Sequence, residues 1–67
     1  MTPHTTDDIE RIGKVVPFTQ AAFMALQSGS TEADIRSAGL RCGLTRQGTD
    51  AALRRAKDKV RSLPRRQ

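Results

Sequence analysis

Five consecutive residues, Gly43-Leu44-Thr45-Arg46-Gln47, carry the strongest chemical signal in the sequence. Glycine suits the left-handed position just past a helix end, and threonine is a preferred cap for the helix that follows. The pattern therefore predicts a tight turn that places Arg46 and Gln47 in the first turn of a helix. A guanidinium donates hydrogen bonds and carries positive charge, and an amide both donates and accepts hydrogen bonds. The chemistry that these two residues indicate is recognition of a polar partner.

Residues that commonly perform catalysis or bind metals are scarce. The single cysteine, Cys42, has no histidine or carboxylate placed by the sequence to activate it, and we interpret it as a small buried apolar residue. His4, the only histidine, lies in a predicted tail. Asp7 and Asp8 stand at a predicted helix start, where the helix dipole explains them. No phosphate loop, catalytic triad or metal motif is present. We therefore expect no enzymatic activity, no metal and no cofactor.

The charge of the chain is unevenly distributed. The net charge is +5 over 67 residues. Residues 1–34 carry two basic and five acidic side chains, a net −3, whereas residues 35–67 carry ten basic and two acidic ones, a net +8. A basic half beside a mildly acidic half indicates one surface that meets a polyanion. Complementarity between the two halves of the same chain is the alternative explanation.

Apolar spacing and capping residues predict an all-α fold, a small three- to four-helix bundle. We expect helices at about 7–15, at 18–27, from Thr31 to just before Gly43, and from a Thr45 cap to about Ser62. The domain would span 7–63, between a flexible tail at 1–6 and a basic tail at 64–67. The apolar positions of the first helix are Ile9, Ile12, Val15 and Val16. The last has an apolar stripe of Thr49, Ala52, Leu53, Ala56, Val60 and Leu63.

The segment from Ile35 to Arg54 satisfies the steric requirements of a helix-turn-helix. Gly39 fits the place where two helices cross, Gly43 the turn, and Leu44 the buried position that follows. Further buried positions fall on Ala38, Cys42 and Leu53. The segment Gly43-Leu44-Thr45-Arg46 resembles helix-turn-helix transcriptional regulators. Among these it is similar to small plasmid repressors of the KorA type. The resemblance covers about a third of the chain, and Thr49 and Ala52 are smaller than the aliphatics common at their positions.

This resemblance implies a small sequence-specific DNA-binding regulator, a repressor or accessory factor, whose last helix enters the major groove. Arg46 would pair with guanine and Gln47 with adenine. Arg54 would contact a base or a phosphate, and Asp50 would read cytosine or orient Arg54. The implied DNA-binding set is Thr45, Arg46, Gln47, Asp50, Arg54, Lys57 and Arg61. Additional phosphate contacts are expected from Arg36 and Arg41.

Two other interpretations remain open at this stage. The segment 18–27 is apolar on more than one side, so the chain is alternatively a small interaction protein that modulates another protein through Phe18, Phe23 and Met24. The basic face is otherwise simply solvated surface. RNA binding by the basic tail is a third possibility that no residue singles out.

Size and composition add expectations about partners and location. A single core of this size supplies only about 3–5 kcal/mol, and one cysteine cannot form an internal disulfide. We therefore expect a homodimer. Its partner, as the resemblance implies, is double-stranded DNA. No apolar run approaches the roughly 20 residues of a membrane span, and no secretory signal is recognisable. The sequence thus predicts a cytoplasmic protein without membrane association.

Overall fold

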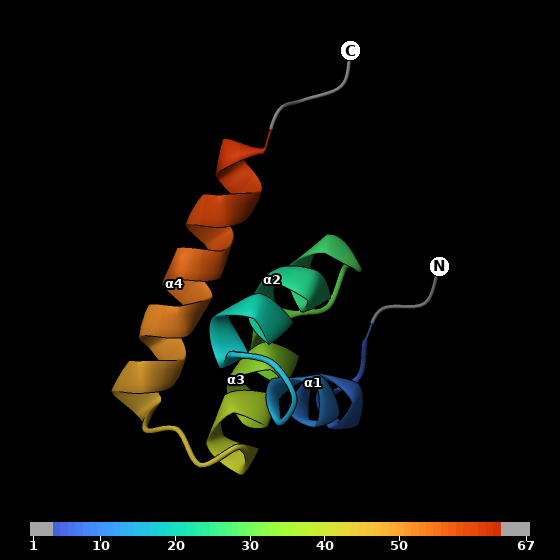
Figure 1. The fold of residues 1–67 in the computed structure, drawn as a ribbon, viewed down its shortest axis with the longest axis vertical. Coiled ribbons are helices and arrows are strands. Elements are labelled where there is room, and N and C mark those ends of the chain that lie inside the picture. The colour runs from blue at the N-terminus through green and yellow to red at the C-terminus, as the bar shows by residue number, and fades with distance from the viewer. Residues whose placement is uncertain (1–3, 64–67) are drawn as a thin grey trace.

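The computed structural model describes residues 4–63, and over this range the chain is helical, without strands. Four helices follow one another: α1 (Thr6–Gly13), α2 (Phe18–Gln27), α3 (Glu32–Arg41) and α4 (Arg46–Ser62). The three short helices cluster against one side of α4, whose C-terminal end extends beyond them (Figure 1). None of the four combines the length and the apolar character needed to cross a membrane. The predicted all-helical fold is confirmed.

Threonine caps set the starts of three helices. The hydroxyl of Thr5 accepts a hydrogen bond from the Asp8 amide at 3.3 Å, and the Asp8 carboxylate accepts one from the Thr5 amide at 3.2 Å. This reciprocal capping box starts α1. The hydrogen bonds also hold the pKa of Asp8 below its ordinary value, because they favour the ionised carboxylate. Thr31 caps α3 and Thr45 caps α4, as predicted.

The end of α1 differs from the prediction. The helix stops at Gly13 instead of continuing to residue 15, and Lys14 and Val15 form a turn. Proline disfavours helical geometry at the residue before it, so the chain must leave the helix ahead of Pro17 and uses these residues to reverse direction. Val15, expected as an apolar position of this helix, therefore lies outside it and is 83% exposed.

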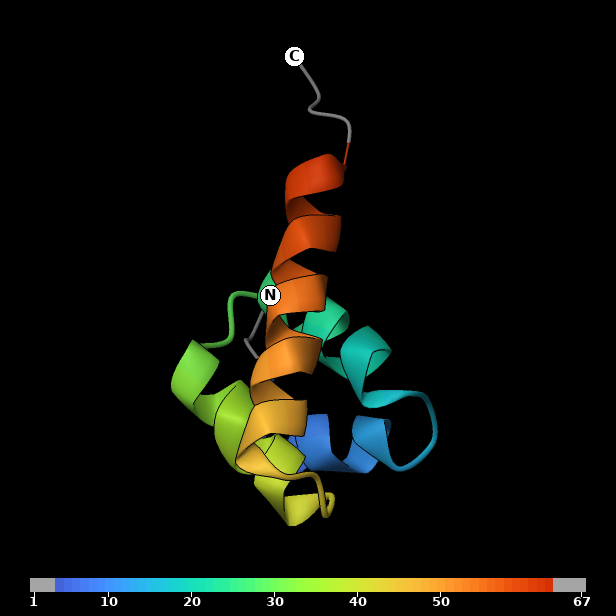
Figure 2. The ribbon, with the colours of Figure 1, turned by 90° about the vertical axis from the view of Figure 1, so that its left-hand side faces the viewer.

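Small side chains dominate the core. Six of its ten members are alanines, and the full set is Ile9, Phe18, Ala21, Ala22, Ala25, Ile35, Ala38, Ala52, Leu53 and Ala56. Alanine brings helix backbones close together, which suits a chain with few large apolar residues. α2 packs extensively on α4, and α1 on α3, so α4 lies across a base formed by the other helices (Figure 2).

The predicted N-terminal tail is partly ordered. The His4 amide donates to the Ser28 hydroxyl at 3.2 Å, and the Ser30 hydroxyl donates to the His4 carbonyl at 2.7 Å. Thr6 already belongs to α1. His4 thus has a structural role through its backbone, where the sequence suggested a free tail. The remaining residues of the two predicted tails, 1–3 and 64–67, lie outside the described residues.

Candidate nucleic-acid interface

The turn between α3 and α4 is closed by backbone hydrogen bonds around Gly43. The Leu44 amide donates to the Gly39 carbonyl and the Gly43 amide to the Leu40 carbonyl, both at 3.1 Å. These two bonds form a Schellman motif, which requires a left-handed residue at Gly43. Its φ of +91° meets this requirement at little cost because glycine has no Cβ. The turn fixes where α4 begins.

Close approach of Gly39 and Thr49 fixes how α3 and α4 cross. A Cβ added to Gly39 would lie 2.5 Å from the Thr49 methyl carbon and 2.7 Å from its hydroxyl oxygen. Thr49 is only 1% exposed, and its hydroxyl donates to the Thr45 carbonyl at 2.8 Å. The small residues at positions 39 and 49 are therefore matched to each other. The predicted helix contact at Gly39 is confirmed.

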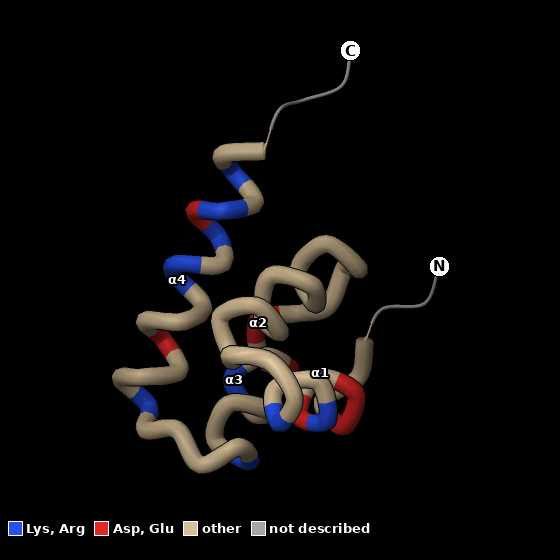
Figure 3. Tube along the Cα trace, in the orientation of Figure 1, with Lys and Arg blue, Asp and Glu red and all other residues tan. Residues whose placement is uncertain are grey.

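The first turn of α4 presents polar side chains to solvent. The Thr45 hydroxyl accepts from the Gly48 amide at 3.0 Å, which satisfies one of the free donors at the helix start. Arg46 and Gln47 follow the cap, and both are exposed. At about 100° per residue, Gln47, Arg54 and Arg61 share one outward arc of α4. Lysine and arginine residues recur along this helix, while acidic residues gather on α1 (Figure 3).

An ionic chain links α3 to the edge of this arc. The Lys57 ammonium lies 2.7 Å from the Glu32 carboxylate, Glu32 lies 3.7 Å from Arg36, and the Arg36 Nε donates to Asp50 at 3.1 Å. Asp50 is thus positioned by Arg36 of the neighbouring helix and not by Arg54 on its own helix. The Lys57 hydrogen bond holds the pKa of Glu32 below its ordinary value.

Arg41 of α3 forms salt bridges with acidic residues of α1. Its guanidinium binds the carboxylate of Asp7 and lies 3.7 Å from that of Glu10. This arginine was predicted as a phosphate contact, and in the structure it is paired with two carboxylates of α1. Part of the basic charge of the second half of the chain is thus neutralised by the acidic first half, as the alternative explanation of the charge pattern anticipated.

In contrast to Arg36 and Arg41 of α3, the arginines of α4 have no acidic partner among the described residues. Within residues 4–63, no salt bridge involves Arg46, Arg54, Arg55 or Arg61. All four are exposed. Arg55 is missing from the set predicted to bind DNA, although it is exposed and lies outside the buried stripe of α4. Its position outside the apolar stripe, directly after Arg54, was the signal that could have identified it.

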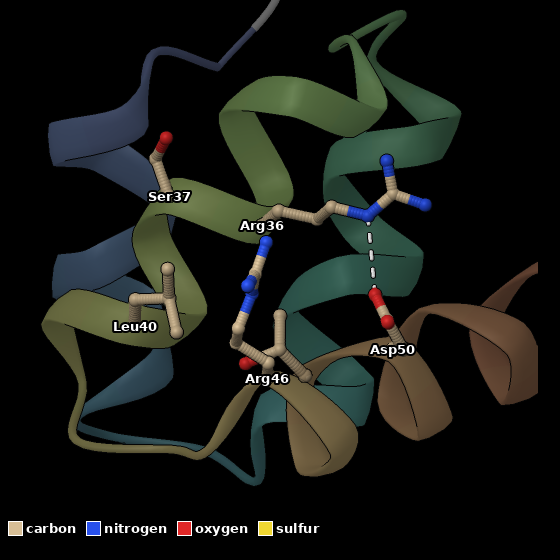
Figure 4. Close-up of a pocket in the computed structure, with 6 residues that line it drawn as sticks. Arg36, Ser37, Leu40, Arg46 and Asp50 are labelled. Carbon is tan, nitrogen blue, oxygen red and sulfur yellow. Dashed lines mark hydrogen bonds and ion pairs between the residues drawn. The ribbon is translucent and has the colours of Figure 1, made fainter.

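A cleft of about 360 Å³ separates α3 from the start of α4. Figure 4 shows that the Arg46 side chain runs toward α3 and ends beside the start of the Arg36 side chain, whose own guanidinium turns away toward Asp50. Arg46 is therefore directed differently from Gln47, its neighbour in the sequence. The cleft is lined by Arg36, Ser37, Leu40, Arg46, Thr49 and Asp50.

The residues of the alternative protein interface divide between core and surface. Phe18 is only 7% exposed and belongs to the core. Phe23 is half-buried, with the Lys59 ammonium 5.6 Å from its ring centre in a cation–π arrangement. Met24 is 37% exposed. Of the three residues, the exposed apolar surface that this alternative needs comes mainly from Met24.

The residues considered for chemistry do not assemble into a centre. Over the part of the chain that the structure describes, no group of three or more histidine, cysteine or carboxylate side chains is arranged to hold a metal ion. The Cys42 thiol is half-buried and lies 3.5 Å from the Glu10 carbonyl, to which it donates.

Comparison with known proteins finds no matching family model, no matching curated protein and no matching solved structure.

Proposed function

We propose that this chain is a sequence-specific DNA-binding regulator in which α3, the Gly43 turn and α4 act as a helix-turn-helix. The single observation that carries the proposal is the outward arc of α4, where Gln47, Arg54 and Arg61 are exposed and the two arginines have no acidic partner within residues 4–63. The hydrogen-bonded turn at Gly43 and the close approach of Gly39 to Thr49 fix the position of α4, and so of this arc, relative to α3.

The arrangement matches the demands of the major groove, which admits one α-helix and presents a distinct pattern of donors and acceptors at each base pair. Gln47 would pair with adenine. Asp50, held by Arg36, would accept from the amino group of cytosine. Arg54, Arg55 and Arg61 would contact guanine or the backbone phosphates beside the groove.

The expected homodimer belongs to the same proposal. The apolar stripe of α4 continues past the last core residue, Ala56, to Val60 and to Leu63, which is 43% exposed. This end of α4 extends beyond the other helices (Figure 1). A second copy that covers it would place two α4 helices on one duplex, and symmetric half-sites would follow from the two-fold symmetry.

Selection of bound sequences from random duplex DNA tests the proposal. We expect a defined consensus, palindromic if two copies bind together. In a Gln47→Ala variant, preference at one base pair of each half-site should fall by about 1–3 kcal/mol, while the other positions keep theirs. Failure to enrich any sequence would contradict sequence-specific binding, and an unchanged consensus in the variant would contradict the role of Gln47.

A further inference from the structure

An ionic chain of four side chains neutralises the edge of α4 that faces α3. The Lys57 ammonium of α4 lies 2.7 Å from the Glu32 carboxylate of α3, and Glu32 also lies 3.7 Å from Arg36. Arg36 in turn donates from its Nε to Asp50 of α4 at 3.1 Å, and Figure 4 shows its side chain extended toward that carboxylate. Two cations and two anions alternate along this chain, so their charges cancel. This edge of α4 therefore presents no net charge to a polyanion.

The same pairing directs Lys57 away from the outward arc of α4. Lys57 stands one helical turn after Arg54 and one before Arg61, so its backbone position lies at the edge of that arc. Its side chain reaches α3 and is half-buried, whereas the two arginines are exposed and have no salt bridge within residues 4–63. Position along the helix thus groups Lys57 with these arginines, and its contacts separate it from them.

A DNA phosphate and the Glu32 carboxylate would compete for the same ammonium. Lysine binds either anion as a compact point charge. Glu32 belongs to a neighbouring helix of the same chain, so its contact with Lys57 does not require two molecules to be brought together. A phosphate that approached Lys57 would also come close to the carboxylates of Glu32 and Asp50, and like charges repel.

We propose that Glu32 withholds Lys57 from the DNA backbone, so that Lys57 makes no phosphate contact. The identification of the competing anion as DNA rests on the function proposed above. Lys57 was expected in the DNA-binding set, and its role is then a contact within the protein. The phosphate contacts of α4 come from Arg54, Arg55 and Arg61, and Glu32 limits the affinity for every duplex.

The test measures DNA affinity as a function of salt for the wild type, Glu32→Gln, Lys57→Gln and the double variant. Each phosphate contact adds about 0.9 to the slope of log affinity against log salt. We expect Lys57→Gln to keep the wild-type slope. Glu32→Gln should steepen the slope by about 0.9 and raise the affinity roughly two- to fivefold on every duplex, because Lys57 becomes available. The double variant should return to the wild-type slope.

The double variant separates competition for Lys57 from general repulsion. Loss of a carboxylate near DNA raises the affinity through the overall field, and this effect of Glu32→Gln is the same with or without Lys57. A gain that acts through Lys57 disappears when Lys57 is replaced. Glu10→Gln is the matched control, because Glu10 forms a similar pair with Lys14 on α1 at 3.4 Å. Its loss should change neither the slope nor the affinity.

A chemically modified duplex locates the released contact. Neutral methylphosphonates are placed one at a time along the backbone. Glu32→Gln should lose affinity at one position to which neither the wild type nor the double variant responds. Circular dichroism confirms that each variant is folded.

The outcomes distinguish this inference from the proposed function. A shallower slope in Lys57→Gln, or an equal effect of Glu32→Gln with and without Lys57, would overturn the role of Glu32 and leave DNA binding intact. Duplex binding by Glu32→Gln but not by the wild type would contradict the proposed function of the wild type and still support the role of Glu32. Absence of duplex binding by all four proteins would overturn both proposals.

Discussion

At the scale of single residues, the pair formed by Gly39 and Thr49 determines how the candidate DNA-binding helix is held. The space that a Cβ on Gly39 would occupy is taken by the methyl and hydroxyl of Thr49, and Phe18 lies 3.1 Å from the same point. A larger aliphatic side chain at position 49 would push the two helices apart. The small residue at that position thus secures the packing of α4.

Substitution of Gly39 by alanine should therefore destabilise the fold. Overpacking costs about 1–3 kcal/mol, and the better helix propensity of alanine returns at most about 1 kcal/mol. In a Thr49→Ala background the same change should cost at least about 0.5 kcal/mol less, because the two side chains no longer overlap. Urea unfolding of the four proteins measures this coupling, and equal costs in both backgrounds would show that the two residues are not in contact.

The bond between Glu32 and Lys57 predicts a dependence of stability on pH. The pKa of Glu32 is lowered in the folded chain, so its contribution is present above the unfolded pKa of about 4.3 and is lost as pH falls through the lowered folded value. The free energy of unfolding should therefore decrease as the pH falls below about 4. Glu32→Gln should remove part of this decrease. If chemical unfolding gives the same pH profile for both proteins, the bond does not contribute.

At the scale of the helical elements, the Gly43 turn determines where α4 starts. A Cβ on Gly43 would meet no atom within 4 Å, so the only obstacle to substitution is its φ of +91°. Gly43→Ala should cost about 1–2 kcal/mol, and Gly43→Asn less, since asparagine tolerates the left-handed region better. This corresponds to a fall in melting temperature of roughly 4–16 °C for alanine. Equal melting temperatures for the wild type and the alanine variant would contradict the turn geometry.

Local signals predicted the helices well. The predicted bounds of α2, Phe18 to Gln27, are confirmed. Thr31, Gly43 and Thr45 marked helix ends because caps act within a few residues. The end of α1 was missed because Pro17 defines only the limit of the helix, and the turn before it depends on how α1 packs on α2. The helix-turn-helix itself stays a prediction.

The candidate site was less predictable because its ionic partners lie far apart in the sequence. Arg41 meets Asp7 and Lys57 meets Glu32 only after the helices pack. Charge counting along the chain could not tell which cations are neutralised within the fold. The direction of Arg46 toward α3 likewise depends on the crossing of the two helices.

At the scale of the whole molecule, the acidic and basic regions are partly matched. Acidic residues of α1 bind Arg41 and Lys14, and Glu32 of α3 binds Lys57. The arginines without a salt-bridge partner within residues 4–63 include four on the exposed surface of α4, and Figure 3 shows basic residues along its length. Among the described residues, the basic side chains without an acidic partner are therefore concentrated on α4.

The salt dependence of DNA binding by two charge-matched variants tests the central claim most directly. Arg54→Gln/Arg55→Gln removes two positive charges from the exposed face of α4, and Arg11→Gln/Lys14→Gln removes two from α1. We predict that the first change makes the slope of log affinity against log salt shallower by about 1.8, or about 0.9 for each phosphate contact, while the second leaves it unchanged. Equal effects of the two variants, or no salt-dependent binding by the wild type, would contradict the proposal that α4 binds DNA.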